Sequence, residues 1–392
     1  MTPSARVQAA IEILDEVIAS ARQDGAPADA IVTRYFKSRR YAGSKDRRAV
    51  RELVFRAIRR SGEPPESGRS AMLGLADDDA DLADLFDGSP HGPAALGEGE
   101  VGANASQIPA WIQPLLSEHV VADEWPALLE RAPIDLRVNA VRANRDELIG
   151  QFENAQPTSH SPWGLRLPAD TRIDDHPAFL QGLVEIQDEG SQLIALACQA
   201  PSATRVLDLC AGAGGKSLAL AAVAPGAEII ATDTNRARLS QLPHRSERAG
   251  VKIEARLLDG GRENAQLADL AAQFDVVLVD APCSGSGTWR RNPEGRWRLS
   301  PDRLERLVKL QEQLLDIAEP LVKPGGALIY ATCSIIRAEG TDQARNFLGR
   351  HSSWKVQDVP FEGGRADGPG RLLTPAHDST DGFFVARFAK SC

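Results

Sequence analysis

The stretch Arg205-Val-Leu-Asp-Leu-Cys-Ala-Gly-Ala-Gly-Gly-Lys-Ser217 decides the fold of this chain. It begins as an apolar run of the length of a buried parallel strand, and it continues as a glycine-rich turn that leads into a helical pattern. Glycines at such a turn let the backbone approach a ligand closely, while the first N–H groups of the helix point at it. The stretch therefore predicts a strand–loop–helix unit with a small-molecule site at the carboxyl end of its strand.

Strand and helix patterns alternate around this stretch from residue 183 onward. The predicted strands are 205–209, 228–232, 253–257, 275–280, 327–332 and 383–388, and the longest predicted helix is 301–319. Alternation at this pitch is typical of an α/β protein with a mostly parallel, doubly wound sheet of the Rossmann type. We therefore expect one α/β domain over residues 183–392.

The residues before 183 predict two further parts. Residues 1–132 are expected to be helical, because apolar positions recur at helical spacing in 4–20 and in 46–58, where Asp46 suits an N-cap. Within this part, 61–102 is acidic and rich in Gly and Pro, which predicts a loop or a poorly ordered segment. Strand patterns at 136–141 and 163–167, with a helical pattern at 145–152, predict a small α/β subdomain over 133–182.

The composition of the chain argues against several classes of protein. Among its 392 residues, no apolar run approaches the roughly 18 residues that a membrane span needs. Acidic residues interrupt the first apolar positions, which is not the pattern of a signal peptide. The five cysteines lack the paired short spacings of a disulfide framework or a zinc site. We expect a cytoplasmic, monomeric protein with free thiols, no membrane association and no metal.

Three ligands suit a glycine-rich loop after a strand, and the spacing of the loop discriminates between them. A phosphate-binding loop needs glycine at the position of Cys210, and a dinucleotide fingerprint needs glycine at the position of Ser217. S-adenosylmethionine (AdoMet) needs only a short glycine loop without phosphate recognition, so the sequence favours it. The residues predicted to bind AdoMet are Cys210, Ala211, Gly212, Ala213, Gly214, Gly215, Lys216, Asp233, Arg238, Asp259 and Asp280.

Four aspartates, Asp208, Asp233, Asp259 and Asp280, each close one of four successive predicted strands. A carboxylate at Asp233 can accept hydrogen bonds from both ribose hydroxyl groups, and Asp259 is expected within reach of an adenine amino group. Any one of these acids could be a plain helix cap. A series along one edge of the sheet is hard to explain by capping alone, so it supports an AdoMet site.

Two cysteines follow predicted strands, Cys283 in Asp280-Ala-Pro-Cys-Ser-Gly and Cys333 in Ala331-Thr-Cys-Ser. The carboxyl ends of parallel strands form the ligand-binding edge of a sheet, so both thiols are expected there. A thiolate is a strong nucleophile and a usable base, and two of them suggest a divided chemical task. The alternative is that both are small buried core residues, as free cysteine often is.

Several segments together resemble one family. Asp208–Ser217, Asp280–Thr288 and Ala331–Ser334 resemble the RsmB-like (Fmu/Sun) RNA cytosine-5 methyltransferases, and Arg290–Ser300 resembles the stretch after the Pro-Cys segment in that family. The resemblance covers about residues 187–390, although Ala213 stands where many members have proline. Tyr41–Val50 resembles part of a NusB-like helical RNA-binding domain. The resemblance implies an AdoMet-dependent methyltransferase domain at 183–392, an RNA-binding domain at 1–132, and 16S ribosomal RNA as substrate, with transfer RNA as the alternative.

The resemblance also implies a division of labour between the thiols. Cytosine C5 is too electron-poor to attack a methyl sulfonium unaided, and a thiolate that adds at C6 turns the ring into an enamine-like nucleophile. The family assigns this addition to Cys333 and the release of the C5 proton to Cys283. Charge that develops on the ring can be neutralised at the ring nitrogen N3, where Asp280 is the expected donor or partner. Spacing alone leaves the opposite assignment of the thiols open. Lys216 is expected to favour thiolate formation, to pair with the methionine carboxylate, or to cap the loop.

Two arginine-rich segments are candidates for RNA contact. Basic residues crowd between 34 and 60, although the net charge of the chain is −9, and local patches decide whether a polyanion binds. Arginines interleaved with tryptophans after the Pro-Cys segment suit phosphate contact and base stacking. The predicted RNA contacts are Arg39, Arg40, Lys45, Arg47, Arg48, Trp289, Arg290, Arg291 and Arg296. The alternative for both segments is a solvated or packed arginine-rich face.

Two other classes of function remain as alternatives. An AdoMet methyltransferase for proteins or small molecules would need no covalent adduct, so the paired thiols argue against it. A non-catalytic RNA-binding or assembly factor would need neither the thiols nor the acids at the sheet edge.

Overall fold

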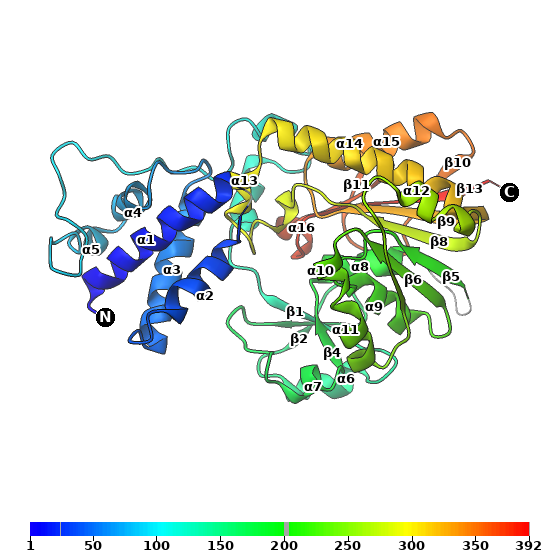
Figure 1. The fold of residues 1–392 in the computed structure, drawn as a ribbon, viewed down its shortest axis with the longest axis horizontal. Coiled ribbons are helices and arrows are strands. Elements are labelled where there is room, and N and C mark those ends of the chain that lie inside the picture. The colour runs from blue at the N-terminus through cyan, green and yellow to red at the C-terminus, as the bar shows by residue number, and fades with distance from the viewer. Residues whose placement is uncertain (24, 200–203, 392) are drawn as a thin grey trace. The chain divides into compact units, whose positions relative to one another are not determined.

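The structure, a computed structural model, describes residues 1–23, 25–199 and 204–391. The chain divides into two units (Figure 1). The helical unit comprises Met1–Leu115, Trp125–Glu130 and Thr288–Ser300, and the sheet unit comprises Leu116–Glu124, Arg131–Gly287 and Pro301–Cys392. Thr288–Ser300 therefore belongs with the N-terminal helices, whereas the sequence placed it in the 183–392 domain.

The helical unit is built from α1 (Pro3–Arg22), α2 (Ala28–Lys37), α3 (Ser44–Arg60), α4 (Gly68–Ala76), α5 (Ala80–Ala83) and α13 (Gly295–Arg298). Helices therefore form where the apolar periodicity of 4–20 and 46–58 predicts them. The apolar stripe of α1 is enclosed, with Val7, Leu14 and Val17 fully buried in the core of the unit. Burial of this stripe, more than helix propensity, stabilises such a bundle.

Two expectations for this unit were wrong. Residues 61–102 are not simply a loop, because α4 and α5 lie there and bring Met72 and Leu82 into the core. Gly and Asp residues interrupt the apolar periodicity of this segment, which hid both helices. Asp46 is not an N-cap, because Gly43 caps α3 and Asp46 instead pairs with Arg6 at 2.8 Å.

A small antiparallel sheet opens the sheet unit, with the strand order β2-β3-β1-β4. Its strands are β1 (Ile134–Val138), β2 (Gln156–Pro157), β3 (Gly164–Leu167) and β4 (Val184–Ile186), and α6 (Arg145–Leu148) and α7 (Pro177–Leu180) accompany them. Leu136, Leu165 and Val184 form its buried core. The sheet therefore extends past the predicted boundary at 182, because β4 completes it.

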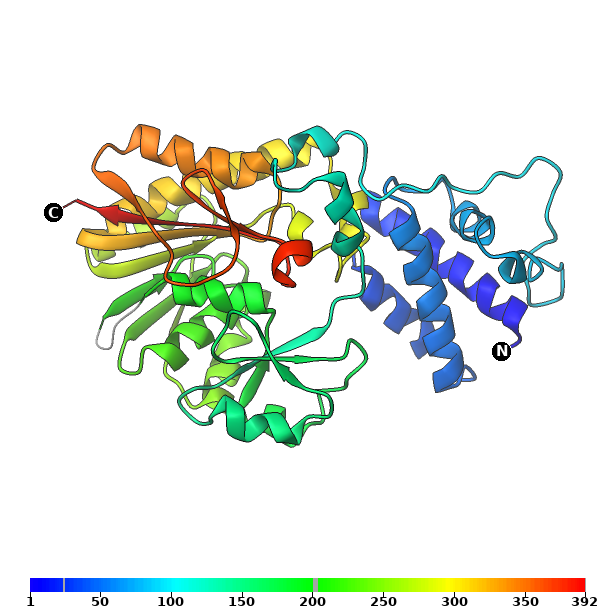
Figure 2. The same cartoon turned by 180° about the vertical axis from the view of Figure 1, so that it is seen from behind.

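The larger sheet has the strand order β11-β12-β13-β9-β8-β5-β6-β7, and β10 pairs with β13. Its strands are β5 (Arg205–Asp208), β6 (Glu228–Asp233), β7 (Glu254–Leu257), β8 (Phe274–Asp280), β9 (Val322–Thr332), β10 (Trp354–Gln357), β11 (Arg365–Asp367), β12 (Gly370–Leu373) and β13 (Phe383–Lys390). Five neighbouring strands, β9, β8, β5, β6 and β7, run parallel to one another. Strand β13, drawn in red beside β9 in Figure 2, runs antiparallel to β9. The predicted Rossmann-like α/β fold is confirmed. The sequence missed β10–β12, which carry too few apolar residues to form a run.

Helices cover this sheet and position its carboxyl edge. They are α8 (Glu189–Ala197), α9 (Gly215–Val223), α10 (Arg236–Leu239), α11 (Leu242–Ala249), α12 (Glu263–Gln266), α14 (Pro301–Ala318), α15 (Thr341–Arg350) and α16 (Pro375–Asp378). Short 3-10 turns are η1 (Gln113–Leu115), η2 (Ala122–Leu128), η3 (Ile149–Gln151), η4 (Ala268–Leu270), η5 (Ser286–Thr288), η6 (Glu319–Leu321) and η7 (Arg337–Glu339). Within the described ranges, no helix combines the length and apolar character required to cross a membrane.

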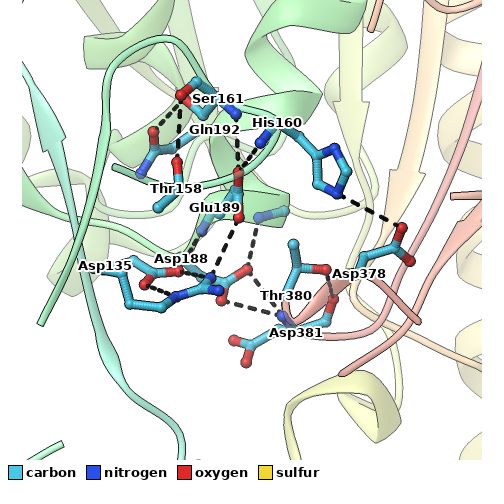
Figure 3. A network of polar contacts seen from close by, with 12 residues as sticks. Asp135, Thr158, His160, Ser161, Asp188, Glu189, Gln192, Asp378, Thr380 and Asp381 are labelled. Atoms are coloured by element: carbon cyan, nitrogen blue, oxygen red, sulfur yellow. Dashed lines mark hydrogen bonds and ion pairs between the residues drawn. The ribbon is translucent and has the colours of Figure 1, made fainter. Parts of the chain in front are cut away.

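A network of buried carboxylates fixes the small sheet to the larger one (Figure 3). Asp135 on β1 pairs with Arg166 at 2.8 Å and accepts a hydrogen bond from the backbone N–H of Glu189 at the start of α8. Asp188, the N-cap of α8, accepts a hydrogen bond from the backbone N–H of Asp381, two residues before β13. The start of α8 is therefore tied both to β1 and to the entry of β13.

Candidate active site

Aspartates gather at the carboxyl edge of the parallel strands. Asp208, Asp233 and Asp280 are the last residues of β5, β6 and β8, and Asp259 lies two residues beyond β7. The register aligns these ends, because Asp208 lies opposite Ala231 and Asp233 lies opposite Leu257. The acids therefore lie along one edge of the sheet, as the sequence predicts, and this is the edge at which such sheets bind ligands.

The glycine-rich loop lies across the end of β6. Gly212 and Gly214 have φ values of +56° and +81°, a conformation that L side chains rarely adopt. A Cβ at Gly214 would lie 2.3 Å from Leu242, and one at Gly212 would lie 2.3 Å from the Arg238 guanidinium. The backbone N–H of Gly212 donates to Asp233 at 2.7 Å. The loop therefore needs glycine at these two positions, and Arg238, one of the residues predicted to bind AdoMet, lies against it.

Asp208 is a fully buried acid beneath this loop. Its Oδ2 accepts a hydrogen bond from the Ser217 hydroxyl at 2.6 Å, and its buried Oδ1 has no partner among the described residues. Burial raises the pKa of Asp208 to about 7. Ser217, which breaks the dinucleotide pattern, thus serves to hold this acid. The sequence counted Asp208 among the edge acids but did not name it as a ligand.

The two thiols meet at the same edge. Cys333 directly follows β9, Cys283 lies three residues beyond β8, and their sulfur atoms are 3.3 Å apart. Both residues are half-buried. The hydrogen bond to Cys333 and burial together raise the pKa of Cys283 well above its usual range. The two sulfur atoms are within hydrogen-bonding distance of each other, and either can be the donor.

Lys216 and Asp280 form an ion pair, with Nζ and Oδ2 2.6 Å apart. Burial lowers the pKa of Lys216, but attraction to Asp280 and the hydrogen bond to it outweigh this effect, so the pKa is raised overall. The negative charge of a Cys333 thiolate acts in the same direction. Lys216 is therefore an ammonium group whose positive charge would attract a Cys333 thiolate.

Three further residues of this region are one that contacts the loop and two that were predicted to bind AdoMet. Arg245, which the sequence did not single out, donates to the carbonyl of Ala213 at 2.7 Å and pairs with Glu185 at 2.9 Å. Asp259 is exposed, and its side chain accepts a hydrogen bond from Gln266 at 3.1 Å. Cys210 is half-buried beside Asp208, and burial raises its pKa well above the usual range. Cys210 therefore lines the loop beside a buried acid.

One acid of the site escaped the sequence analysis. Glu339 in η7 is fully buried and accepts hydrogen bonds from Ser284 and Ser334, the residues that follow the two cysteines. It stands in a short turn, where no periodic pattern points to burial. The available signal was its place six residues after Cys333, in a stretch that is otherwise mostly apolar or basic.

The first group of predicted RNA contacts lies in the helical unit. Arg40, Lys45, Arg47 and Arg48 are exposed around the start of α3. Arg39 is half-buried, stacks 3.6 Å from the centre of the Tyr35 ring and pairs with Glu12 at 3.2 Å. Tyr35, Arg39 and Tyr41 line a hollow of about 1120 Å³, and Tyr41 is 74% exposed. This surface offers both cations and an aromatic ring to solvent.

The second group requires a correction. Trp289 and Arg296 are 1% exposed, and Arg290 is 6% exposed. Arg296 donates to the backbone carbonyls of Ile58 at 2.6 Å and Pro293 at 2.9 Å. These side chains therefore contribute to the interior of the helical unit and present no surface to RNA, whereas Arg291 is half-buried. The prediction was wrong because charge and aromatic content do not reveal burial.

Acids from the 61–102 segment neutralise part of the basic α3. Arg60 pairs with Asp78 at 2.6 Å, and Arg56 pairs with Asp79 at 3.1 Å. Arg51 likewise pairs with Asp29 at 2.7 Å. The acidic segment, which the sequence could not place, thus pairs with Arg56 and Arg60, whereas Arg51 pairs with an acid of α2.

Comparisons with known proteins agree with this geometry. Residues 194–389, half of the chain, match the family described as 16S rRNA methyltransferase RsmB/F. Ribosomal RNA small subunit methyltransferase B of Salmonella paratyphi B is 35% identical over 290 residues, which are 72% of this chain and 66% of the relative. The chain thus spans just under two thirds of the curated relatives' length.

Solved structures extend the likeness to the fold. The crystal structure of PH0851 superposes with a TM-score of 0.79 at 25% identity, over 98% of this chain and 99% of that one. A methyltransferase homolog protein from Pyrococcus horikoshii gives a TM-score of 0.61 at 25% identity, over 70% of this chain and 92% of that one. The chain belongs to the 16S rRNA methyltransferase RsmB/F family.

Proposed function

We propose that this chain methylates C5 of a cytosine in RNA, and that its substrate is 16S ribosomal RNA. The observation that carries the proposal is the 3.3 Å separation of the Cys283 and Cys333 sulfur atoms at the sheet edge that also bears the glycine-rich loop. Methylation of oxygen or nitrogen needs no thiol, whereas C5 of cytosine needs a nucleophile at C6. The description of the family and the names of the curated relatives support the choice of RNA.

The residues around the loop fit AdoMet. Gly215 leaves open space, since a Cβ there would meet nothing within 4 Å, and the unpartnered Oδ1 of Asp208 suits an N–H donor. We assign AdoMet binding to the backbone of 210–215, to Lys216 and Arg238, and to the carboxylates of Asp233, Asp259 and Asp280. When bound, AdoMet supplies the electrophilic methyl group that C5 accepts.

Cys333 starts the reaction as the nucleophile. Its thiolate forms a bond to C6, and the C5–C6 double-bond electrons become available at C5. Attraction between the Cys333 charge and the Lys216 ammonium contributes to the raised pKa of Lys216, so the two groups interact. Asp280, bonded to Lys216, is a carboxylate and can only accept, so it suits the exocyclic amino group of cytosine, while Lys216 offers the donor toward N3.

Cys283 completes the reaction as the base. The charge of a Cys333 thiolate opposes ionisation of Cys283, so this opposition ends once Cys333 has become a neutral thioether. Cys283 then loses its proton to solvent water, and the resulting thiolate accepts the proton from C5, which regenerates the Cys283 thiol. The electron pair of the C5–H bond restores the double bond, and the Cys333–C6 bond breaks with its electrons on sulfur. Because the hydrogen bond to Cys333 and burial both raise the pKa of Cys283, we assign the later step to this thiol.

RNA contact is assigned to the exposed cations of the helical unit. We propose that Arg39, Arg40, Lys45, Arg47 and Arg48 contact phosphates and that the half-buried Arg291 contributes. Tyr41, exposed beside Arg39, offers a stacking surface for a base. The protein acts as a monomer in the cytoplasm, where its RNA substrate is made. Transfer RNA is the second candidate substrate, which the same chemistry would accept.

The experiment is methyl transfer from labelled AdoMet to RNA that lacks modifications. We expect 5-methylcytosine at one position of 16S ribosomal RNA and none in transfer RNA. Digestion of the product to nucleosides identifies the methylated atom, and mapping identifies the nucleotide. Labelled 5-methylcytosine in transfer RNA alone would change the substrate, and a label on any atom other than C5 would contradict the reaction.

A further inference from the structure

Glu339 uses its whole hydrogen-bonding capacity within the protein. Its Oε1 accepts hydrogen bonds from the backbone N–H of Ser284 at 2.8 Å and from Gln311 Nε2 at 3.0 Å. Its Oε2 accepts hydrogen bonds from the hydroxyl groups of Ser334, at 2.6 Å, and Ser284. A carboxylate offers about four acceptor positions, so none is left for a substrate. Glu339 therefore acts through the residues that it holds.

Those residues belong to the two loops that carry the thiols. Ser284 follows Cys283 and Ser334 follows Cys333, so one carboxylate bridges two loops that lie 50 residues apart in sequence. The parallel ladder of β8 and β9 ends at Asp280 and Ala331. Beyond it, the spacing of the loops depends on contacts such as these, together with the hydrogen bond from the Gly287 N–H to the Cys333 carbonyl.

The bridge is itself anchored to rigid elements. The Glu339 backbone carbonyl accepts hydrogen bonds from the hydroxyl groups of Tyr330 at 2.7 Å and Thr332 at 3.2 Å, both on β9. Gln311, on α14, also donates to the carbonyl of Pro282 at 3.0 Å. A group that is held from a strand and a helix can hold the loops within the narrow limits that reactions require.

The charge of Glu339 also reaches the thiols. The hydrogen bond to Cys333 is the largest cause of the raised pKa of Cys283, burial is the next, and the negative charges of Cys333 and Glu339 follow. Loss of the Glu339 charge would therefore make Cys283 easier to ionise.

We propose that Glu339 is a positioning residue that holds the Cys283 and Cys333 sulfur atoms together through Ser284 and Ser334, so that one cytosine ring meets both in turn. This inference rests on the proposed function, because it assumes that both thiols react with the same base. It predicts that Glu339 governs the chemical step and leaves RNA binding unaffected.

The test compares Glu339→Gln with the matched control Asp135→Asn. Asp135 is an equally buried carboxylate in the same unit, but it bonds to Arg166 and α8 and touches neither thiol loop. A misplacement of reacting groups by about 1 Å costs on the order of 100-fold in rate. We expect Glu339→Gln to lower kcat by about 100-fold with the KM for RNA unchanged, and Asp135→Asn to keep the kcat of the wild type.

A second measurement needs neither RNA nor activity. Alkylation of Cys283 by iodoacetamide, followed by mass spectrometry across pH, reports its ionisation. We expect the profile of Glu339→Gln to shift to lower pH than that of the wild type and of Asp135→Asn. A purely structural carboxylate would leave this profile unmoved.

Three outcomes would overturn the inference: a wild-type kcat in Glu339→Gln, an unmoved alkylation profile, or an equal loss of kcat in Asp135→Asn. Should Glu339→Gln fail to fold, Ser334→Ala removes one arm of the bridge, and an unchanged kcat there would overturn the inference too. If the wild type makes no 5-methylcytosine, the proposed function fails instead, and the alkylation profile still decides whether Glu339 controls the thiol.

Discussion

The sheet edge around the thiols and the Thr288–Ser300 segment use buried charge in opposite ways. At the edge, Lys216 and Asp280 form an ion pair beside two thiols that are only half-buried. A substrate that reaches the thiols would therefore also lie close to these charges. In the segment, the Arg296 guanidinium is enclosed and bonded to backbone carbonyls. Its charge ties the backbone of α3 to α13 and faces no ligand. A buried charge close to a reactive group indicates a catalytic role, whereas a buried charge that is bonded to backbone carbonyls indicates a structural role.

Substitution of the thiols should have the largest effect on activity and is the strongest test of the catalytic role of the sheet edge. Cys333→Ala should lower methylation by about 10⁴-fold or more, because it removes the nucleophile that activates C5. It should also form no covalent RNA adduct. Cys283→Ala should form the adduct and accumulate it, because the C5 proton has no base to accept it. A denaturing gel of protein incubated with AdoMet and labelled RNA separates the two results.

The opposite pattern, an adduct in Cys333→Ala and none in Cys283→Ala, would exchange the roles of the thiols and leave the reaction intact. Adducts in neither variant, with methylation retained in both, would remove the thiols from the reaction. Cys198→Ala is the matched control, because this fully buried cysteine lies at the C-terminal end of α8, where its thiol donates to the Ile194 carbonyl.

The same contrast explains what the sequence could reveal. Apolar runs such as β5 and β8 predict buried strands, and parallel strands bring their carboxyl ends together, so Cys283 and Cys333 could be placed at one edge without coordinates. The burial of Arg296 depends on Ile58, which lies more than 200 residues earlier in the chain. No local pattern carries that information. The role of Glu339 could not be predicted for a related reason, because its partners come from two loops and its own turn has no periodic pattern.

Asp208 offers the next largest effect, through the pH dependence of stability. Its pKa of about 7 in the folded state lies above the value of about 3.9 for a free aspartate, so folding favours the protonated form. Between about pH 4 and 7, the folded protein holds a proton that the unfolded chain has lost. Asp208 therefore contributes stability below pH 4 that is lost as the pH rises to 7, in total about 4 kcal/mol.

Asp208→Asn removes this dependence, because an amide does not titrate. Urea unfolding at pH 5 and at pH 7 should show a free energy that falls less steeply with pH in the variant than in the wild type. An identical pH dependence in both proteins would show that burial does not control this acid. Asp208→Asn should also weaken AdoMet binding if the free Oδ1 accepts a hydrogen bond from the cofactor.

Substitution of Arg296 tests whether the buried charge of the Thr288–Ser300 segment has a structural role. Arg296→Met keeps most of the volume but leaves the carbonyls of Ile58 and Pro293 without their donor, so the free energy of unfolding should fall by about 3 kcal/mol. Arg40→Met, at an exposed position of the same unit, should change it by less than about 0.5 kcal/mol. Chemical denaturation of both variants measures the difference. A stable Arg296→Met protein with weakened RNA binding would restore the original prediction of an RNA contact.

The smallest expected effect separates exposed cations from paired ones within the helical unit. Lys45→Ala should weaken RNA binding about three- to fivefold and reduce the slope of log affinity against log salt by about 0.7, the value for one phosphate contact on single-stranded RNA. Arg56→Ala is the control, because its guanidinium already pairs with Asp79 and should leave the slope unchanged. Titrations of labelled RNA at several salt concentrations measure both slopes. An equal fall in the two variants would mean that total charge, and not the pairing seen here, decides how this unit meets RNA. A fall in Lys45→Ala alone would show that the acidic 61–102 segment selects which cations of α3 are left for the polyanion.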